Sequence, residues 1–249
     1  MLLLVSGEGP SDIGRLAPGR QGPAFFPGPM TLILDKLVED VVQYSLLDFQ
    51  AVHFVHKTEL LVVEPKHSGR RLSAPGKRTA KETGYYYENA RRLALKAGEL
   101  ARESEDTVVP VLFRDADGTQ SSGRGEWRDK WKSMLNGFED GDSLLGVPML
   151  PKPKSEAWLL CALRTPAYQH CAVLELASGN DDSPDSLKGQ LERVRNGSST
   201  TEDLNQAILA GDVDPLRIDM HSFNQFKKQL TEVLQRVIVP AALEPDNQD

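Results

Sequence analysis

Residues 107–119 read Thr-Val-Val-Pro-Val-Leu-Phe-Arg-Asp-Ala-Asp-Gly-Thr, and this stretch decides the fold class. Its first part, Thr107–Phe113, is an apolar run rich in β-branched residues, which predicts a β-strand. Pro110 has no backbone N–H, so we expect it at an edge or a bulge rather than at an ordinary central position. Two aspartates, Asp115 and Asp117, follow the strand, at the place where ligands bind in open α/β sheets.

Shorter patterns on both sides of this strand alternate between strand and helix. Apolar runs predict strands at Leu2–Ser6, Ala51–Val55, Leu60–Val63 and Leu144–Leu150. Helical periodicity predicts helices at Met30–Tyr44, Glu82–Arg102, Glu126–Phe138 and, capped by Ser155, at Ser155–Leu163. The Gly- and Pro-rich stretch Gly7–Pro29 is expected to be a long loop. The alternation predicts an α/β fold with a mostly parallel sheet flanked by helices.

The pattern after Arg164 is helical. Helices are predicted at Leu187–Val194, Thr201–Leu209 and Phe223–Val237. The last of these carries its apolar residues on one side. We therefore expect a core of residues 1–165 and an acidic, helical C-terminal extension, residues 166–249, packed on that core.

The charge is unevenly spread along the 249 residues. Lys and Arg number 29 against 36 Asp and Glu, a net charge of −7, which excludes a uniformly basic nucleic-acid coat. Ser155 onward holds 8 basic and 15 acidic residues, so the whole deficit lies there. Within 65–81 a local basic stretch contains Arg70, Arg71, Lys77 and Arg78, which would attract a polyanion. The alternative interpretation of this stretch is an ordinary solvated loop.

Two cysteines, Cys161 and Cys171, exclude a disulfide scaffold and a four-thiolate zinc site. We expect Cys161 to pack in a core beside Trp158. No run is as long as a membrane helix requires, and the opening residues lack the basic region of a signal peptide. These features predict a cytoplasmic protein that does not bind membranes.

Acidic residues follow two of the predicted strands. Glu8 lies in a Gly7-Glu8-Gly9 loop after the first strand, and Asp115 and Asp117 follow the strand that ends at Phe113. Carboxylates that converge at strand ends suit a hard cation such as Mg²⁺ or Mn²⁺. The alternative for Asp115-Ala-Asp117-Gly is a turn held by side-chain hydrogen bonds.

A third segment, Leu150-Pro-Lys-Pro-Lys-Ser-Glu-Ala-Trp-Leu-Leu160, combines Lys154 and Glu156 at a junction between a strand and a helix. A helix N-terminus with lysines favours an anion. An ordinary helix start with apolar core residues is the other interpretation. Gly7 and Gly9 do not complete a Gly-x-Gly-x-x-Gly loop, and no Gly-Lys-Ser/Thr occurs, so neither dinucleotide nor Walker A binding is indicated.

These three motifs, in this order, resemble the TOPRIM (topoisomerase-primase) fold family. The segment Pro153-Lys-Ser-Glu156-Ala-Trp-Leu-Leu160 is similar to a signature of small stand-alone TOPRIM-like proteins of bacterial antiphage defence and abortive-infection systems. Ser186–Leu191, with Lys188, resembles the Lys-bearing helix of that group. The resemblance covers roughly Leu2–Leu191. The 107 positions from Glu8 to Asp115 exceed a minimal TOPRIM core, so the basic stretch would be an insertion.

The resemblance implies a Rossmann-like TOPRIM core and a Mg²⁺- or Mn²⁺-dependent nuclease that cleaves phosphodiesters. Glu8 would be a general acid/base or a metal ligand, and Asp115 and Asp117 would bind the metal. Lys154, Glu156 and Lys188 would complete the site as charge stabiliser, second metal ligand and phosphate clamp. The resemblance also implies nucleic acid as partner, DNA rather than RNA, together with an ABC- or AAA-type ATPase and a homo-oligomer.

Two other functions stay open. The letters of residues 111–119 also fit a haloacid-dehalogenase-type phosphatase, with Asp115 as nucleophile and Asp117 as acid/base. Lys188 would then bind the phosphoryl group, and residues 179–182 would be the late acidic motif. The second possibility is a non-catalytic TOPRIM-like partner subunit, in which the Phe223–Val237 helix would dock another protein.

Overall fold

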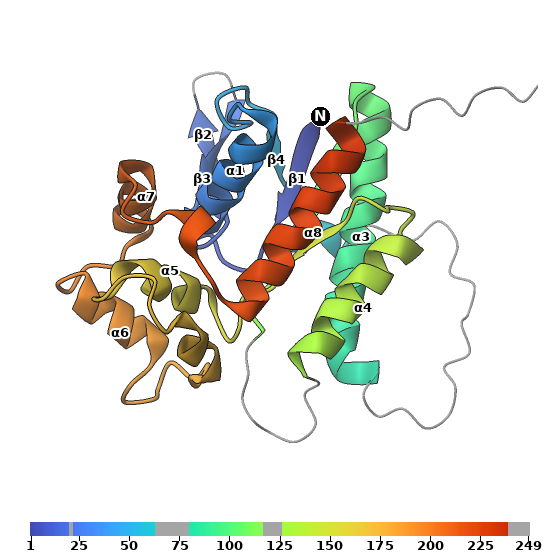
Figure 1. The fold of residues 1–249 in the computed structure, drawn as a ribbon. Coiled ribbons are helices and arrows are strands. Elements are labelled where there is room, and N and C mark those ends of the chain that lie inside the picture. Colours follow the sequence, from blue (N-terminus) through green and yellow to red (C-terminus); the bar gives the residue numbers. More distant parts are fainter. Residues whose placement is uncertain (20–21, 63–79, 117–125, 239–249) are drawn as a thin grey trace, which may run out of the picture.

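The computed structural model describes residues 1–19, 22–62, 80–116 and 126–238. Four strands form one parallel sheet in the order β4-β1-β5-β6 (Figure 1). They are β1 (Leu2–Ser6), β4 (Val52–Phe54), β5 (Val108–Phe113) and β6 (Val147–Met149). Helices flank the sheet, so the predicted α/β class with a parallel sheet is confirmed.

Both faces of the sheet are covered by helices. Side chains alternate along a strand, so Leu3 and Val5 enter one hydrophobic cluster while Leu4, between them, enters the other. The first cluster lies against α1 (Pro29–Val42) and α8 (His221–Ile238), and the second against α3 (Ala80–Ser104) and α4 (Trp127–Asp140) (Figure 1). Burial on both faces explains why the strands are continuous apolar runs.

Pro110 occupies a central strand, contrary to the expectation of an edge or a bulge. β5 lies between β1 and β6, and Pro110 stands opposite Leu4 of β1. The pairing of β6 with β5 begins only at Val111. Pro110 therefore precedes the stretch that is paired on both sides, which explains how a residue without an N–H is tolerated there.

The prediction that Gly7–Pro29 is a loop is wrong for its second half. β2 (Gly14–Gly19) and β3 (Gly22–Pro27) form an antiparallel pair. Prolines are acceptable because this two-stranded ribbon consists of edges only. Gly14 has φ +116°, and a Cβ there would lie 2.2 Å from the Phe26 carbonyl oxygen, so the close approach requires glycine.

The strand predicted at Leu60–Val63 is also wrong over its described residues. Leu60 ends the short helix α2 (Lys57–Leu60), and the next two residues form a turn. His56 caps this helix: its ring accepts from the Thr58 N–H, while Glu59 accepts from the His56 N–H. This reciprocal capping box overrides the strand propensity of the apolar residues.

Helices fill the C-terminal third, as predicted. They are α5 (Ser155–Leu163), η1 (Cys171–Leu176), α6 (Leu187–Val194), α7 (Thr201–Ala210) and η2 (Pro215–Arg217), followed by α8. The buried Trp158 of α5 packs against Phe223 and Phe226 of α8, at ring-centre distances of 4.9 and 5.8 Å. The apolar side of α8 is thus part of the main core.

Cys161 is buried beside Trp158, as expected, but its bond to Cys171 was not predicted. The two sulfur atoms form a disulfide that joins α5 to η1. Sequence spacing does not indicate such a pairing, because nothing in the chain shows that α5 and η1 fold against each other. One bond remains far from a disulfide scaffold.

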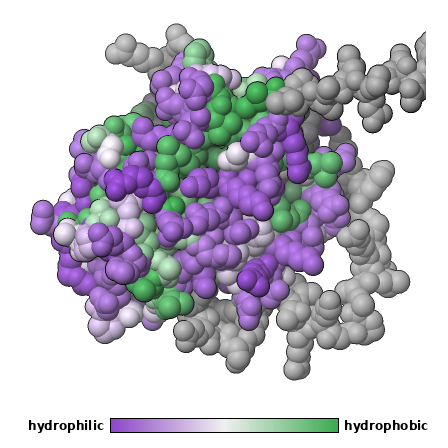
Figure 2. All heavy atoms as spheres, in the orientation of Figure 1, coloured by the Kyte–Doolittle hydropathy of each residue, from purple (hydrophilic) through white to green (hydrophobic). Residues whose placement is uncertain are grey.

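The face seen in Figure 2 is largely hydrophilic along α8. Hydrophobic atoms gather near the top of this view. Val41, Tyr44, Val237 and Ile238 line a cavity of about 360 Å³ between α1 and the end of α8. None of the helices within the described ranges is both long and apolar enough to cross a membrane.

Candidate functional site

The sheet has a switch point between β1 and β5. The chain leaves β1 toward β4 on one side and then crosses to β5 on the other. In open α/β sheets the ligand site lies at such a point, beyond the carboxyl ends of the strands. A cavity of about 550 Å³ lies there. Its wall includes Asp12, Asp115, Lys154, Glu156, Asp181 and Lys188.

Two aspartates from different strand ends meet at the start of α5. The Ser155 N–H donates to Asp115 Oδ1 at 3.0 Å, and the Ser155 hydroxyl donates to Asp12 Oδ1 at 2.7 Å. The sequence predicted that Ser155 caps this helix, and that prediction is wrong. The N-cap residue is Lys154, and its side chain makes no capping hydrogen bond. The Asp115 carboxylate supplies the missing acceptor for the helix N-terminus.

Glu156, the next residue, has a raised pKa. Burial is the main cause, because it disfavours the charged carboxylate. The nearby carboxylates Asp12 and Asp181 raise the pKa further, while Lys154 lowers it. Glu156 thus lies among like charges that a bound cation would stabilise.

The predicted lysines are on the same cavity. Lys154 Nζ lies 3.0 Å from both carboxylate oxygens of Asp181. Lys188, in the first turn of α6, is exposed at the wall. Four residues predicted from the sequence are thereby brought together: Asp115, Lys154, Glu156 and Lys188.

Glu8 lies elsewhere, in a cluster of its own. Its Oε1 is 3.3 Å from Arg114 Nε and accepts from the Tyr85 hydroxyl at 2.5 Å. Arg114 has no exposed surface and also donates to the Phe113 carbonyl and to Asn89 Oδ1. Burial lowers the pKa of Arg114, and Glu8 works against that shift; burial and Glu8 raise the pKa of Tyr85. Glu8 is not among the described residues that line the cavity.

The donor set of the cavity suits a hard cation. Asp12, Asp115 and Glu156 offer carboxylate oxygens, the atoms that Mg²⁺ and Mn²⁺ prefer. Within the described ranges, no three Asp, Glu, His or Cys side chains lie close enough to form a ready metal-binding group. Oδ1 of Asp12 and Oδ1 of Asp115 accept from Ser155, and Asp12 Oδ2 accepts from the Ser11 hydroxyl at 3.1 Å, so a cation would share carboxylate oxygens that already have hydrogen-bond partners.

Five predicted residues fall outside the described ranges: the metal ligand Asp117 and the basic residues Arg70, Arg71, Lys77 and Arg78. Their roles remain predictions. The residue that sequence reasoning missed is Asp12, although it ends the acidic motif after β1 that contains Glu8. Its neighbours Gly9, Pro10 and Ser11 indicate a turn, which is the signal for a side chain able to fold back over the strand ends.

Comparisons with protein-family models, with curated proteins and with solved structures found no match to this chain. The TOPRIM resemblance therefore stays a prediction from the sequence motifs. A function for this chain has to be inferred from the geometry and the charges of the cavity.

Proposed function

We propose that the chain is a divalent-cation-dependent nuclease whose reaction centre is the cavity lined by Asp12, Asp115 and Glu156. One observation carries this proposal. Residues from the ends of β1 and β5, from the start of α5 and from α6 line one cavity at the switch point of the sheet. Four residues predicted from the sequence, Asp115, Lys154, Glu156 and Lys188, thus line one cavity although they come from distant parts of the chain.

Charge explains why a cation is needed. Asp12, Asp115, Glu156, Asp181 and Glu202 face the cavity, against two lysines, Lys154 and Lys188. A phosphodiester would be repelled by this surplus of carboxylates unless a cation were bound first. A divalent cation neutralises charge at the phosphate and lowers the pKa of a bound water.

The protein groups would then have distinct tasks. Asp12, Asp115 and Glu156 hold the cation, with Asp117 as a further ligand. Lys188 is exposed at the wall and binds the phosphate, while Lys154, paired with Asp181, stabilises charge in the transition state. Glu8 acts through Arg114, which directly precedes Asp115 and donates to the Phe113 carbonyl at the end of β5. In this role Glu8 positions the strand end.

The context of the reaction rests on the TOPRIM resemblance. From this resemblance we propose that the substrate is DNA and that the chain works with an ABC- or AAA-type ATPase. The same resemblance supports a homo-oligomeric state and a role in antiphage defence in the cytoplasm. The basic residues Arg70, Arg71, Lys77 and Arg78 would add contacts to the nucleic-acid backbone.

The test is cleavage of nicked and linear DNA with Mg²⁺ or Mn²⁺ by wild type and Asp115→Asn. The amide can still accept the Ser155 N–H, so the fold should be retained. We expect a loss of activity of roughly 100-fold or more, the upper range for groups that tune a metal site. Asp48→Asn, an exposed aspartate before β4, is the matched control and should cleave like wild type. Equal activity of Asp115→Asn and wild type would refute the site.

A phosphatase of the haloacid-dehalogenase type is the second candidate. Its favouring observation is that Asp181, in the late acidic segment 179–182, lines the same cavity as Asp115 and Lys188. Hydrolysis of p-nitrophenyl phosphate without DNA cleavage would identify this activity. An inactive wild type in both assays would favour the non-catalytic partner. The docking surface first considered for that partner is not accessible, because Phe223, Phe226 and Leu230 of α8 are buried.

A further inference from the structure

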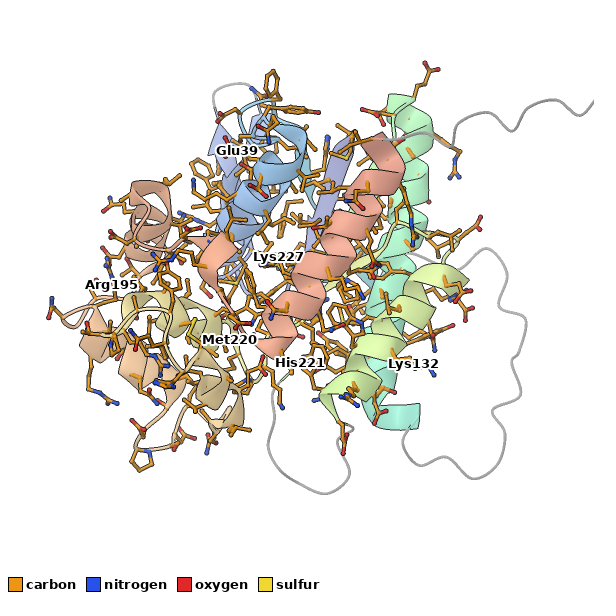
Figure 3. The ribbon with its side chains drawn as sticks, in the orientation of Figure 1. Glu39, Lys132, Arg195, Met220, His221 and Lys227 are labelled. Atoms are coloured by element: carbon orange, nitrogen blue, oxygen red, sulfur yellow. A yellow bond between two sulfur atoms is a disulfide. The ribbon has the colours of Figure 1, made fainter. Side chains whose placement is uncertain are left out.

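A second, larger cavity lies beside the proposed reaction centre. It measures about 620 Å³ and is bounded by the starts of α4 and α8, by η1 and by the segment before α5. Its wall includes Ala116, Trp127, Arg128, Lys152, Pro153 and His221. Figure 3 shows His221 at the lower end of α8, beside α4.

The two cavities lie next to each other along two segments of the chain. Asp115 lines the reaction cavity and Ala116 lines the second one. In the same way, Lys154 faces the reaction cavity while Lys152 and Pro153 face the second. Because consecutive residues of two segments line different cavities, the cavities lie on opposite sides of those segments. The two cavities are therefore neighbours, which is the arrangement that a base and the adjacent phosphate of one strand would need.

The second cavity has a rigid aromatic wall. Trp127 stacks on Trp131, with ring centres 5.2 Å apart, and meets His221 edge-on at the same distance. The indole N–H of Trp127 donates to the Leu150 carbonyl at 2.9 Å, which fixes the orientation of the ring. A fixed indole beside an imidazole suits a flat, apolar ring that brings its own hydrogen-bonding edge.

The charges of this cavity differ from those of the reaction cavity. Glu175 is buried and accepts the Ser222 N–H at 2.6 Å, and Lys130 is buried over the Tyr86 ring, so both take part in the fold. The exposed Glu126 lines the cavity too, and so do the cations Arg128 and Lys152, neither of which is in an ion pair in the described part of the chain. An anionic ligand with an aromatic ring matches this wall.

We propose that the second cavity binds one unpaired base of the nucleic acid, next to the phosphate held in the reaction cavity. The base lies against Trp127 and His221, and Lys152 contacts the backbone where it crosses the wall between the cavities. This inference rests on the proposed function. It makes the substrate a strand with at least one unstacked base at the cleavage site, in contrast to a fully paired duplex.

The test measures binding of a short oligothymidylate and of an abasic oligonucleotide of equal length. Both carry the same phosphates, so the difference in affinity reports the base. The Asp115→Asn protein is used with Mg²⁺ present, so that a cation offsets the carboxylates of the reaction cavity while the substitution suppresses cleavage, and tryptophan fluorescence gives the readout. We expect the abasic strand to bind roughly tenfold more weakly, which is within the range for one stacked base.

Two variants locate the effect. His221→Ala should remove most of the difference between the two strands, and Lys152→Gln should weaken both by a similar factor. Lys132→Gln is the matched control, because Lys132 lies on α4, is exposed and is not among the described residues of this cavity. The inference would be refuted if neither strand bound, or if the two strands bound with equal affinity. It would also be refuted if His221→Ala kept the full difference in affinity between the strands, or if an acidic peptide displaced both strands equally well.

The outcome separates this inference from the proposed function. Asp115-dependent DNA cleavage without base discrimination would leave the nuclease intact and remove only the base site. Base discrimination that requires His221, in a protein without nuclease activity, would leave the base site and remove the nuclease.

Discussion

Two groups of acids lie at the carboxyl ends of the sheet, and they differ in what surrounds them. Glu8 faces the buried guanidinium of Arg114 and the hydroxyl of Tyr85, so its charge is matched within the fold. Asp12 and Asp115 instead accept from the neutral groups of Ser155, and the carboxyl of Glu156 lies near them. The position of an acidic residue after a strand therefore does not show whether it can bind a ligand until the charges of the neighbouring side chains are known.

The largest expected effect is on stability, from Glu8→Gln. The change leaves the guanidinium of Arg114 buried without its counter-charge, which costs about 3 kcal/mol. One third of the Glu8 side chain is exposed, so we use the lower end of the range for buried pairs. Urea unfolding measures the loss. Glu39→Gln, an exposed acid on α1, is the control and should change the free energy of unfolding very little.

Equal stability of Glu8→Gln and Glu39→Gln would remove the contrast between the two groups of acids, because Glu8 would then be as free as a surface acid. Glu8 would in that case regain the role of a metal ligand or general acid/base that the sequence predicted for it.

The next effect is a pH dependence from Glu156. Its pKa is raised in the folded protein, mainly by burial, so the folded state keeps this proton to a higher pH than the unfolded chain does. The free energy of unfolding must then fall as pH rises from the ordinary glutamate range through the folded pKa. Glu156→Gln should remove this slope, so that the variant gains stability relative to wild type as pH rises. Unfolding in urea with EDTA over a pH series measures it.

Parallel pH curves for wild type and Glu156→Gln would show that Glu156 has an ordinary, solvated environment. The acids of the cavity would then no longer differ from ordinary solvated acids, and the contrast with Glu8 would be removed.

The smallest expected effect on the free energy of unfolding comes from Asp106, at the opposite end of the sheet, and it serves as a reference for the other two. Asp106 pairs with the N-terminal ammonium at 2.7 Å and is exposed, and the hydrogen bond from that ammonium lowers its pKa. Asp106→Asn should lower the free energy of unfolding by roughly 0.5 kcal/mol at neutral pH, as for other surface ion pairs. The difference should vanish as pH falls through the lowered pKa, since the wild-type acid is then protonated. Thermal unfolding at two pH values is sufficient. A loss as large as that of Glu8→Gln would contradict the role assigned to burial.

The sequence predicted the parts of the fold that local patterns encode. The apolar run at residues 108–113 and the periodicity of residues 187–194 gave an element at the right place, because a fully buried strand and a helix with one apolar side and a serine cap are both encoded locally. The hairpin after Asp12 was missed, since its glycines and prolines favour a loop by composition and only the pairing with a second strand makes them a ribbon. The helix α2 was missed because the reciprocal capping hydrogen bonds of His56 and Glu59 outweigh the strand propensity of the apolar residues that follow.

The site was predictable where the chemistry is local and unpredictable where it is not. Asp115 and Glu156 follow strands, so their convergence could be expected from the position of strand ends. Whether Glu8 or Asp12 faces Ser155 depends on Arg114, which the sequence places beside Asp115 without showing that it turns inward. A buried arginine is a product of tertiary structure.

The bond between Ser155 and Asp12 joins residues that are 143 positions apart, and it has a consequence for protein synthesis. Chains are made from the N-terminus and fold as units emerge from the ribosome. Asp12 and Asp115 emerge well before Ser155, and Trp158 finds its partners Phe223 and Phe226 only when α8 has emerged as well. A nascent chain without α8 therefore lacks the packing partners of Trp158, so α5, whose first residue bonds Asp12 and Asp115, completes its packing only after α8 has been made.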